Sequence, residues 1–156
     1  LINNSAVPQI LQYTITPKFS NNGIICYGTP IIVPITVNPT PQLTGYLIQT
    51  SICTNKLFTY YPTSNTPNTF FNWTRAAVTG IPNPAILNGT NGISETLVNT
   101  TQAPIKVLYD YVLTANGCSN NQVVVDTVFS NAKSEHIDDR FRVLQVETSF
   151  FVVVFE

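Results

Sequence analysis

Apolar and polar residues alternate along several short stretches of the chain, and residues typical of turns follow each stretch. The alternation is clearest where Ile105, Val107, Tyr109, Tyr111 and Leu113 fall on one face of an extended strand. Short strands at this spacing are typical of an antiparallel sandwich and not of alternating strands and helices. The pattern therefore predicts an all-β fold.

The same pattern predicts a series of strands between residues 42 and 128. Clusters rich in proline and asparagine at residues 62–68 and 80–84 are expected to be turns. Residues 75–79 are compatible with one turn of helix. The predicted strands cover residues 47–53, 56–60, 69–74, 93–97, 105–114 and 122–128.

Part of the pattern occurs twice. Residues 3–15 resemble residues 99–111, with an asparagine, a proline and a tyrosine in register. In both copies an Asn-Gly pair and then a run of β-branched residues follow. The offset of about 95 residues is the size of one small β-sandwich. We therefore expect residues 1–40 to be the last strands of a preceding, incomplete repeat and residues 42–128 to be a complete repeat.

The segments that flank the complete repeat differ from it in composition. Residues 38–41 form a linker that two prolines stiffen, because proline fixes φ and restricts the residue before it. Residues 129–156 begin with a charged stretch and end in a strongly β-prone one. This tail is either buried as a strand or does not belong to the repeat array. Our hypothesis is that it supplies a missing strand to the incomplete first repeat.

Composition narrows the range of functions. Charged residues make up 10% of the 156 residues, and the net charge is −1. This excludes the basic surface that nucleic-acid binding requires. No window has the long apolar run of a membrane-spanning helix, so membrane insertion is not expected. The chain lacks an initiating methionine, and we expect it to be a piece of a longer protein.

Few residues suggest chemistry. Trp73, Tyr109 and Tyr111 could stack on sugars, but packing in the core of a sandwich is the favoured interpretation. Arg75 and Glu95 are expected to form a surface pair of small energetic effect. His136 lies in the charged tail without a nucleophile nearby, so a solvated segment is favoured over a catalytic base. No enzyme activity, cofactor or metal site is predicted.

Five motifs of the complete repeat together resemble a known family. They lie at residues 51–55, 58–63, 71–78, 92–97 and 111–118. Together they are similar to the PKD-like, immunoglobulin-like repeats of secreted Bacteroidetes surface proteins. The resemblance covers residues 44–128 well and residues 1–40 as a partial copy, and it does not cover residues 129–156. Asp126 departs from the family pattern, which has an apolar residue or threonine there.

The resemblance implies a disulfide between Cys53 and Cys118, with two reduced thiols as the alternative. By the internal repeat, Cys26 corresponds to Cys118, and its partner would lie in the missing half-repeat. Cys26 is therefore expected to be unpaired or bonded to another chain. Disulfides of this kind persist outside the cell.

The resemblance also implies a function. It points to an extracellular tandem repeat of a surface adhesin or gliding-type protein, exported by the type IX route, that acts as a spacer or adhesive module. Its expected partners are neighbouring repeats of the same protein. Surface polysaccharide or another cell-surface protein is a further candidate partner. The alternative is a carbohydrate-binding module of a secreted polysaccharide-degrading enzyme. Exposed aromatics in a planar row would favour the alternative, and a buried Trp73 and Tyr109 would favour the spacer.

Overall fold

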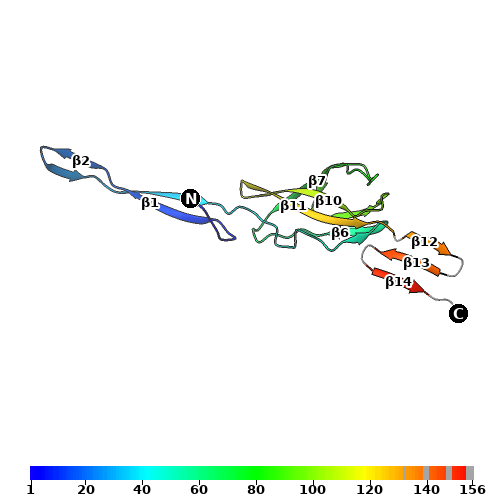
Figure 1. The fold of residues 1–156 in the computed structure, drawn as a ribbon. Helices are drawn as coiled ribbons and strands as arrows, with labels where there is room; N and C mark the ends of the chain where they lie inside the picture. Colours follow the sequence, from blue (N-terminus) through cyan, green and yellow to red (C-terminus); the bar gives the residue numbers. More distant parts are fainter. Residues whose placement is uncertain (132, 139–140, 147–148, 154–156) are drawn as a thin grey trace.

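The computed structural model describes residues 1–131, 133–138, 141–146 and 149–153, with side chains described for residues 1–131. The described elements are all strands. Figure 1 shows a long N-terminal arm, a central sandwich and a C-terminal sheet following one another along the molecule. Among the described residues, no helix has the length and apolar character needed to cross a membrane.

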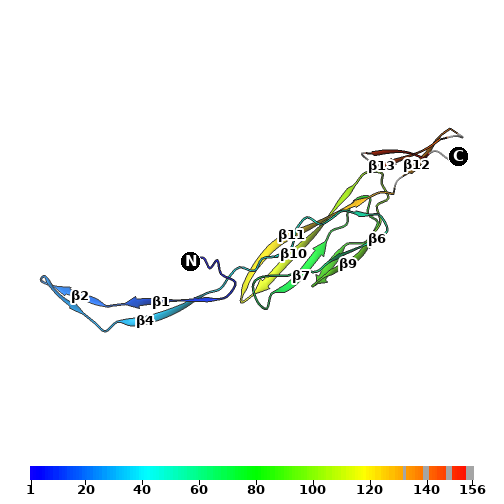
Figure 2. The same ribbon diagram turned by 90° about the horizontal axis from the view of Figure 1, so that it is seen from below.

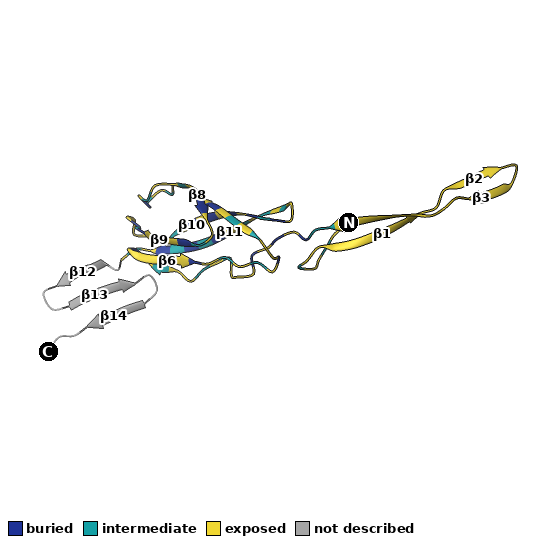
Figure 3. Ribbon diagram, turned by 180° about the vertical axis from the view of Figure 1, so that it is seen from behind, coloured by how far each residue is buried: buried dark blue, intermediate teal, exposed yellow. Residues whose placement is uncertain are grey.

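The arm is an antiparallel hairpin that narrows to a tight turn. β1 (Gln9–Ile15) pairs with β4 (Ile31–Val37), and beyond them β2 (Lys18–Asn21) pairs with β3 (Ile24–Tyr27). Asn22 and Gly23 form the tip, with φ angles of 45° and 81°. A two-residue turn with both φ angles positive matches the twist of a hairpin, which explains the Asn-Gly pair. Figure 3 shows the arm exposed along its length.

The central part consists of two packed sheets. One contains five strands in the order β5-β11-β10-β7-β8, and the other contains the pair β6-β9. All pairings are antiparallel except the short contact between β5 and β11. The strands are β5 (Ile52–Cys53), β6 (Lys56–Tyr60), β7 (Phe70–Arg75), β8 (Ile86–Thr90), β9 (Ile93–Leu97), β10 (Ile105–Ala115) and β11 (Cys118–Phe129).

This strand order is that of an immunoglobulin-like sandwich, in which the third strand of the domain carries a buried tryptophan. Here the third strand is β7, and its Trp73 is 6% exposed. Alternate side chains of β10 point inward, as the sequence pattern predicts, and Val107, Tyr109, Tyr111 and Leu113 are completely buried. The predicted all-β, immunoglobulin-like fold is confirmed.

Three local expectations were wrong. Residues 75–79 form no helical turn, because Gly80 adopts a φ of 86° and Ile81 donates its N–H to the carbonyl of Val78 in a tight turn. Of the first predicted strand, residues 47–53, only Ile52–Cys53 forms a strand, and Ile48 forms an isolated bridge. β8 was missed, since its Asn-Gly content is typical of loops and pairing with β7 alone makes it a strand.

The C-terminal tail forms a sheet of its own. β12 (Lys133–Asp138), β13 (Phe141–Val146) and β14 (Ser149–Val153) pair in that order. This sheet contains no strand of the arm, and Figures 1 and 2 show it at the opposite end of the sandwich. The hypothesis that the tail supplies a strand to the first repeat is therefore wrong. Strands joined by short connections pair with each other at a smaller cost in chain entropy.

Candidate functional site

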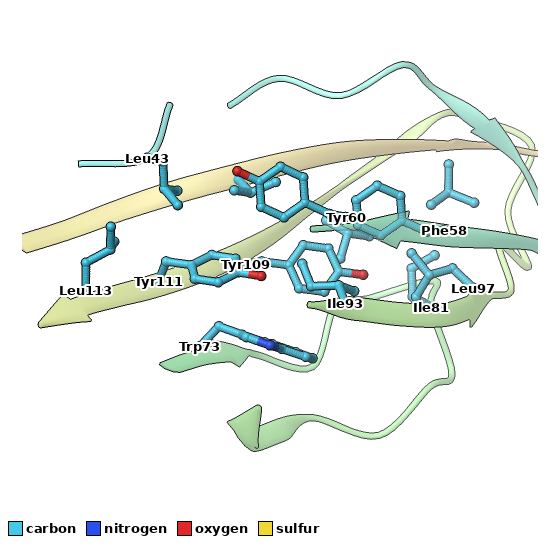
Figure 4. Packing of buried hydrophobic residues seen from close by; sticks show 13 residues of the cluster. Leu43, Phe58, Tyr60, Trp73, Ile81, Ile93, Leu97, Tyr109, Tyr111 and Leu113 are labelled. Atoms are coloured by element: carbon cyan, nitrogen blue, oxygen red, sulfur yellow. The ribbon is translucent and has the colours of Figure 1, made fainter. Parts of the chain in front are cut away.

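The predicted core aromatics meet at the centre of the sandwich. Figure 4 shows Trp73 on one side of Tyr109 and Tyr111, with Phe58 and Tyr60 on the other. The Trp73 ring packs edge-on against Tyr109, with ring centres 5.6 Å apart, and it is tilted against Tyr111 at 6.4 Å. These are favourable geometries for aromatic pairs. The predicted core role of Trp73, Tyr109 and Tyr111 agrees with their burial.

An aromatic stack occupies the position at which antibody domains have their inter-sheet disulfide. That disulfide joins the second strand of the domain to the sixth. Here these strands are β6 and β10, and they are joined by Phe58 stacked on Tyr109 at 5.4 Å. The two sheets are therefore held together by ring packing and not by sulfur.

Glycine allows the indole to lie close to the neighbouring strand. A Cβ atom on Gly89 of β8 would lie 2.2 Å from Cε2 of Trp73. No side chain fits at that distance, so the backbone of β8 itself covers the outer face of the ring. The close approach explains why a glycine occurs inside this strand.

Arg75 and Glu95 form a buried ion pair, and the expectation of a surface pair was wrong. The Arg75 side chain is fully buried and that of Glu95 is 11% exposed. The guanidinium Nη2 donates to Glu95 Oε1 at 2.7 Å, and Nε donates to Oε2 at 3.0 Å. Nη2 also donates to the carbonyl of Pro84 at 2.6 Å, and Tyr109 OH donates to Glu95 Oε2 at 2.9 Å. Burial, and then the Glu95 carboxylate, raise the pKa of Tyr109.

Asp126 is a second buried carboxylate, and it has no cationic partner among the described residues. It is 0% exposed, its Oδ1 accepts the N–H of Thr127 at 2.8 Å, and its Oδ2 has no hydrogen-bond partner there. Burial raises the pKa of Asp126 to about 6, because removal from water disfavours the charged form. A charged Asp126 at neutral pH therefore weakens the fold.

Replacing this carboxylate should change how stability depends on pH. The pKa of Asp126 is higher in the folded state than in the unfolded state. The stability that the neutral carboxyl contributes is therefore complete below about pH 4 and is lost as pH rises to about 6. We expect Asp126→Asn to raise stability at pH 7 by roughly 2–3 kcal/mol relative to the native chain, and to leave it nearly unchanged at pH 4. Urea denaturation at both pH values measures this, and an equal effect at both would contradict it.

The cysteines do not form the predicted disulfide. Cys53 pairs with Phe129 at one end of β11, whereas Cys118 begins that strand at the other end. Eleven residue steps of about 3.3 Å separate the two ends by roughly 35 Å, and a disulfide needs Cα atoms within about 7 Å. Both are free thiols, so this prediction was wrong.

Cys26 is a free, exposed thiol near the tip of the arm. It pairs with Phe19 in the arm, and Cys118 pairs with Ala115 in the sandwich. Counted from Gln9 and Ile105, Phe19 occupies the position of Ala115, whereas counted from the two Asn-Gly turns Ile24 occupies the position of Cys118. The correspondence between Cys26 and Cys118 stays a prediction. A bond from Cys26 to another chain stays a prediction.

The linker between arm and sandwich is fixed in place. Pro39 and Pro41 are fully buried although they lie outside any strand. Asn38 Nδ2 donates to the carbonyl of Asn116 at 2.6 Å, and Asn120 Nδ2 donates to the carbonyl of Pro41 at 2.9 Å. The linker is thus packed on the β10–β11 hairpin, and we call this contact the joint.

The joint extends one residue further into the sandwich. The backbone N–H of Leu43 donates to Gln122 Oε1 at 2.6 Å, and the Leu43 side chain belongs to the core. Sequence reasoning identified the stiff prolines but missed Asn116, Asn120 and Gln122, because their role depends on the linker folding back onto the hairpin.

The outer face of the five-stranded sheet has a shallow groove of about 140 Å³. The polar Asn72, Thr74 and Asp110 line it on adjacent strands. Trp73 and the exposed Leu87 also line it, and the surface that the groove offers is mostly apolar. Asp110 is the only carboxylate in it. One carboxylate without a second acid or base beside it does not make a glycosidase site, and no metal-binding group of three ligands occurs among the described side chains.

A comparison with protein families matches one segment of this chain. A family model described as PKD-like domain matches residues 1–41, which are the arm and the linker up to Pro41. The match therefore covers the incomplete first repeat and not residues 44–128, where the five motifs of the resemblance lie. A search of curated proteins finds no match. The chain is thus an all-β, immunoglobulin-like protein with a PKD-like segment, a class of domain that is typically extracellular.

Proposed function

We propose that this chain is a non-enzymatic, extracellular spacer module of a tandem-repeat surface protein. The observation that carries the proposal is the joint, in which Pro39 and Pro41 are buried and Asn38 is bonded to the adjacent hairpin. A spacer must transmit direction from one unit to the next, and a docked linker does so where a flexible one does not. The PKD-like match to residues 1–41 supports the extracellular setting.

The location of the aromatics supports a spacer over a carbohydrate-binding module. A sugar platform needs exposed rings, but Trp73 and Tyr109 are buried, and Tyr109 stacks on Phe58 of the other sheet. In the proposed setting, neighbouring repeats are the first partners, and loops at the surface offer weak, multivalent contacts to polysaccharide or to another surface protein. A surface adhesin or gliding-type protein exported by the type IX route is the parent we propose.

A distance measurement across the joint tests the proposal. Cys26 on the arm and Cys53 on the sandwich are exposed thiols that can carry spin labels, once Cys118 is replaced by serine. We expect a narrow distribution of label distances in the otherwise native chain, because the linker is docked. Replacing both Pro39 and Pro41 by alanine should broaden it, since each then loses its fixed φ and part of its buried contact.

Thr40 and Gln42 supply the matched control, because they alternate with the two prolines and are exposed. Replacing both by alanine should leave the distribution narrow. A broad distribution in the native chain would show a flexible linker and would overturn the spacer proposal.

A further inference from the structure

The arm repeats the hydrogen-bond pattern that precedes β10 in the sandwich. Asn99 Nδ2 donates to the carbonyls of Ala103 and Val128, both at 2.8 Å. In the arm, Asn3 Nδ2 donates to the carbonyls of Val7 and Val37 at 2.8 and 2.7 Å. In each copy a hydroxyl two residues later, on Ser5 or Thr101, donates to the asparagine Oδ1.

The strand register continues this correspondence. Gln9 pairs with Val37 in the arm, just as Ile105 pairs with Val128 in the sandwich. Both hairpins end in an Asn-Gly turn with positive φ angles. Over β1 and β4 the arm therefore repeats the pairing of the β10–β11 hairpin, which lies inside the five-stranded sheet.

The two hairpins differ in what covers them. Val107, Tyr109 and Tyr111 are 0% exposed beneath the other sheet. At the corresponding positions of the arm, Leu11, Tyr13 and Ile15 are 42%, 44% and 55% exposed. Their cross-strand partners Ile35, Val33 and Ile31 are exposed as well, so this side of the arm is a continuous apolar surface that we call the inner face.

We propose that the inner face binds the first half of a PKD-like repeat, carried on the same polypeptide ahead of Leu1. The sandwich shows what such a half-repeat supplies, because residues 42–97 cover the equivalent face of β10 and β11. The same register places Leu1 where Leu97 ends β9, and Leu97 is completely buried. The partner thus consists of strands of the β6, β7 and β9 kind with an apolar inner side.

A second copy of the chain fits this surface less well. Its own residues 42–97 already cover its own β10–β11 hairpin, where the core residues are buried. The tail sheet β12–β14 lies at the far end of the sandwich (Figure 2). A free half-repeat is the occupant with the right shape and an entry point at Leu1. This inference does not depend on the spacer proposal.

An extended chain tests the inference. A copy of residues 42–96 is placed directly before Leu1, and hydrogen exchange is followed at the amides of β1 and β4. A two-stranded hairpin alone is marginally stable, so in the native chain the arm should be mostly paired but should open often. These amides should therefore exchange roughly 100-fold more slowly in the extended chain than in the native chain. Slow exchange at β10 in both chains confirms that the sandwich is folded.

Two substitutions on β1 distinguish specific covering from general stabilisation. Tyr13→Asp places a charge on the inner face and should abolish the protection, whereas Thr14→Asp on the opposite face should preserve it. Equally fast exchange of the arm in native and extended chains would overturn the inference. A concentration-dependent dimer of the native chain that Tyr13→Asp dissociates would assign the inner face to a second copy and would also overturn it.

Discussion

Glu95→Ala should destabilise the sandwich by about 3–5 kcal/mol, because it leaves the fully buried guanidinium of Arg75 without its counter-charge. Tyr109 OH loses its acceptor in the same step. The change should appear as a lower urea midpoint, followed by the fluorescence of Trp73. A loss below about 1 kcal/mol, as for an exposed pair, would contradict the buried geometry.

The double variant Arg75→Met with Glu95→Leu is the control for this prediction. It removes both charges and replaces them with apolar side chains of similar length. We expect it to be more stable than Glu95→Ala, because the cost of the single variant comes from an unpaired buried charge and not from the loss of attraction alone. A double variant that is less stable than the single one would contradict this interpretation.

Trp73→Ala should also lower stability by about 3–5 kcal/mol, since it empties the space between Tyr109, Tyr111 and the backbone at Gly89. Urea denaturation followed by circular dichroism measures the loss. Phe70 is the matched control, because it is an aromatic on the same strand with 68% of its surface exposed. Phe70→Ala should cost less than about 1 kcal/mol. Similar losses in the two variants would show that Trp73 is not the centre of the core.

Predictions of strands and of their inward residues were most accurate where the local pattern of apolar residues agrees with the observed burial. Alternation along β10 identified its inward residues, and the repeated asparagine, proline and tyrosine pointed to a second hairpin of the same kind. The predictions failed where a neighbouring strand decides whether a segment becomes a strand. β8 becomes a strand only because β7 lies beside it, and Ile48 forms a single bridge because its neighbours find no continuous partner.

The disulfide shows the limit of an argument from family resemblance. Two cysteines at the two ends of a repeat suggest a bond, but β11 is extended and holds them at its opposite ends. Ring stacking between Phe58 and Tyr109 joins the sheets instead. Sequence spacing does not reveal the distance between two cysteines, because that distance depends on which strands lie side by side in the folded chain.

Local periodicity and the fixed φ of proline were enough to establish the all-β class, the alternation of inward residues and the stiff linker. The shared burial of Arg75 and Glu95, the docking of the linker on a hairpin and the uncovered inner face of the arm became known from the folded structure alone. Each of these depends on contacts between residues far apart in the chain, and local periodicity carries no information about them.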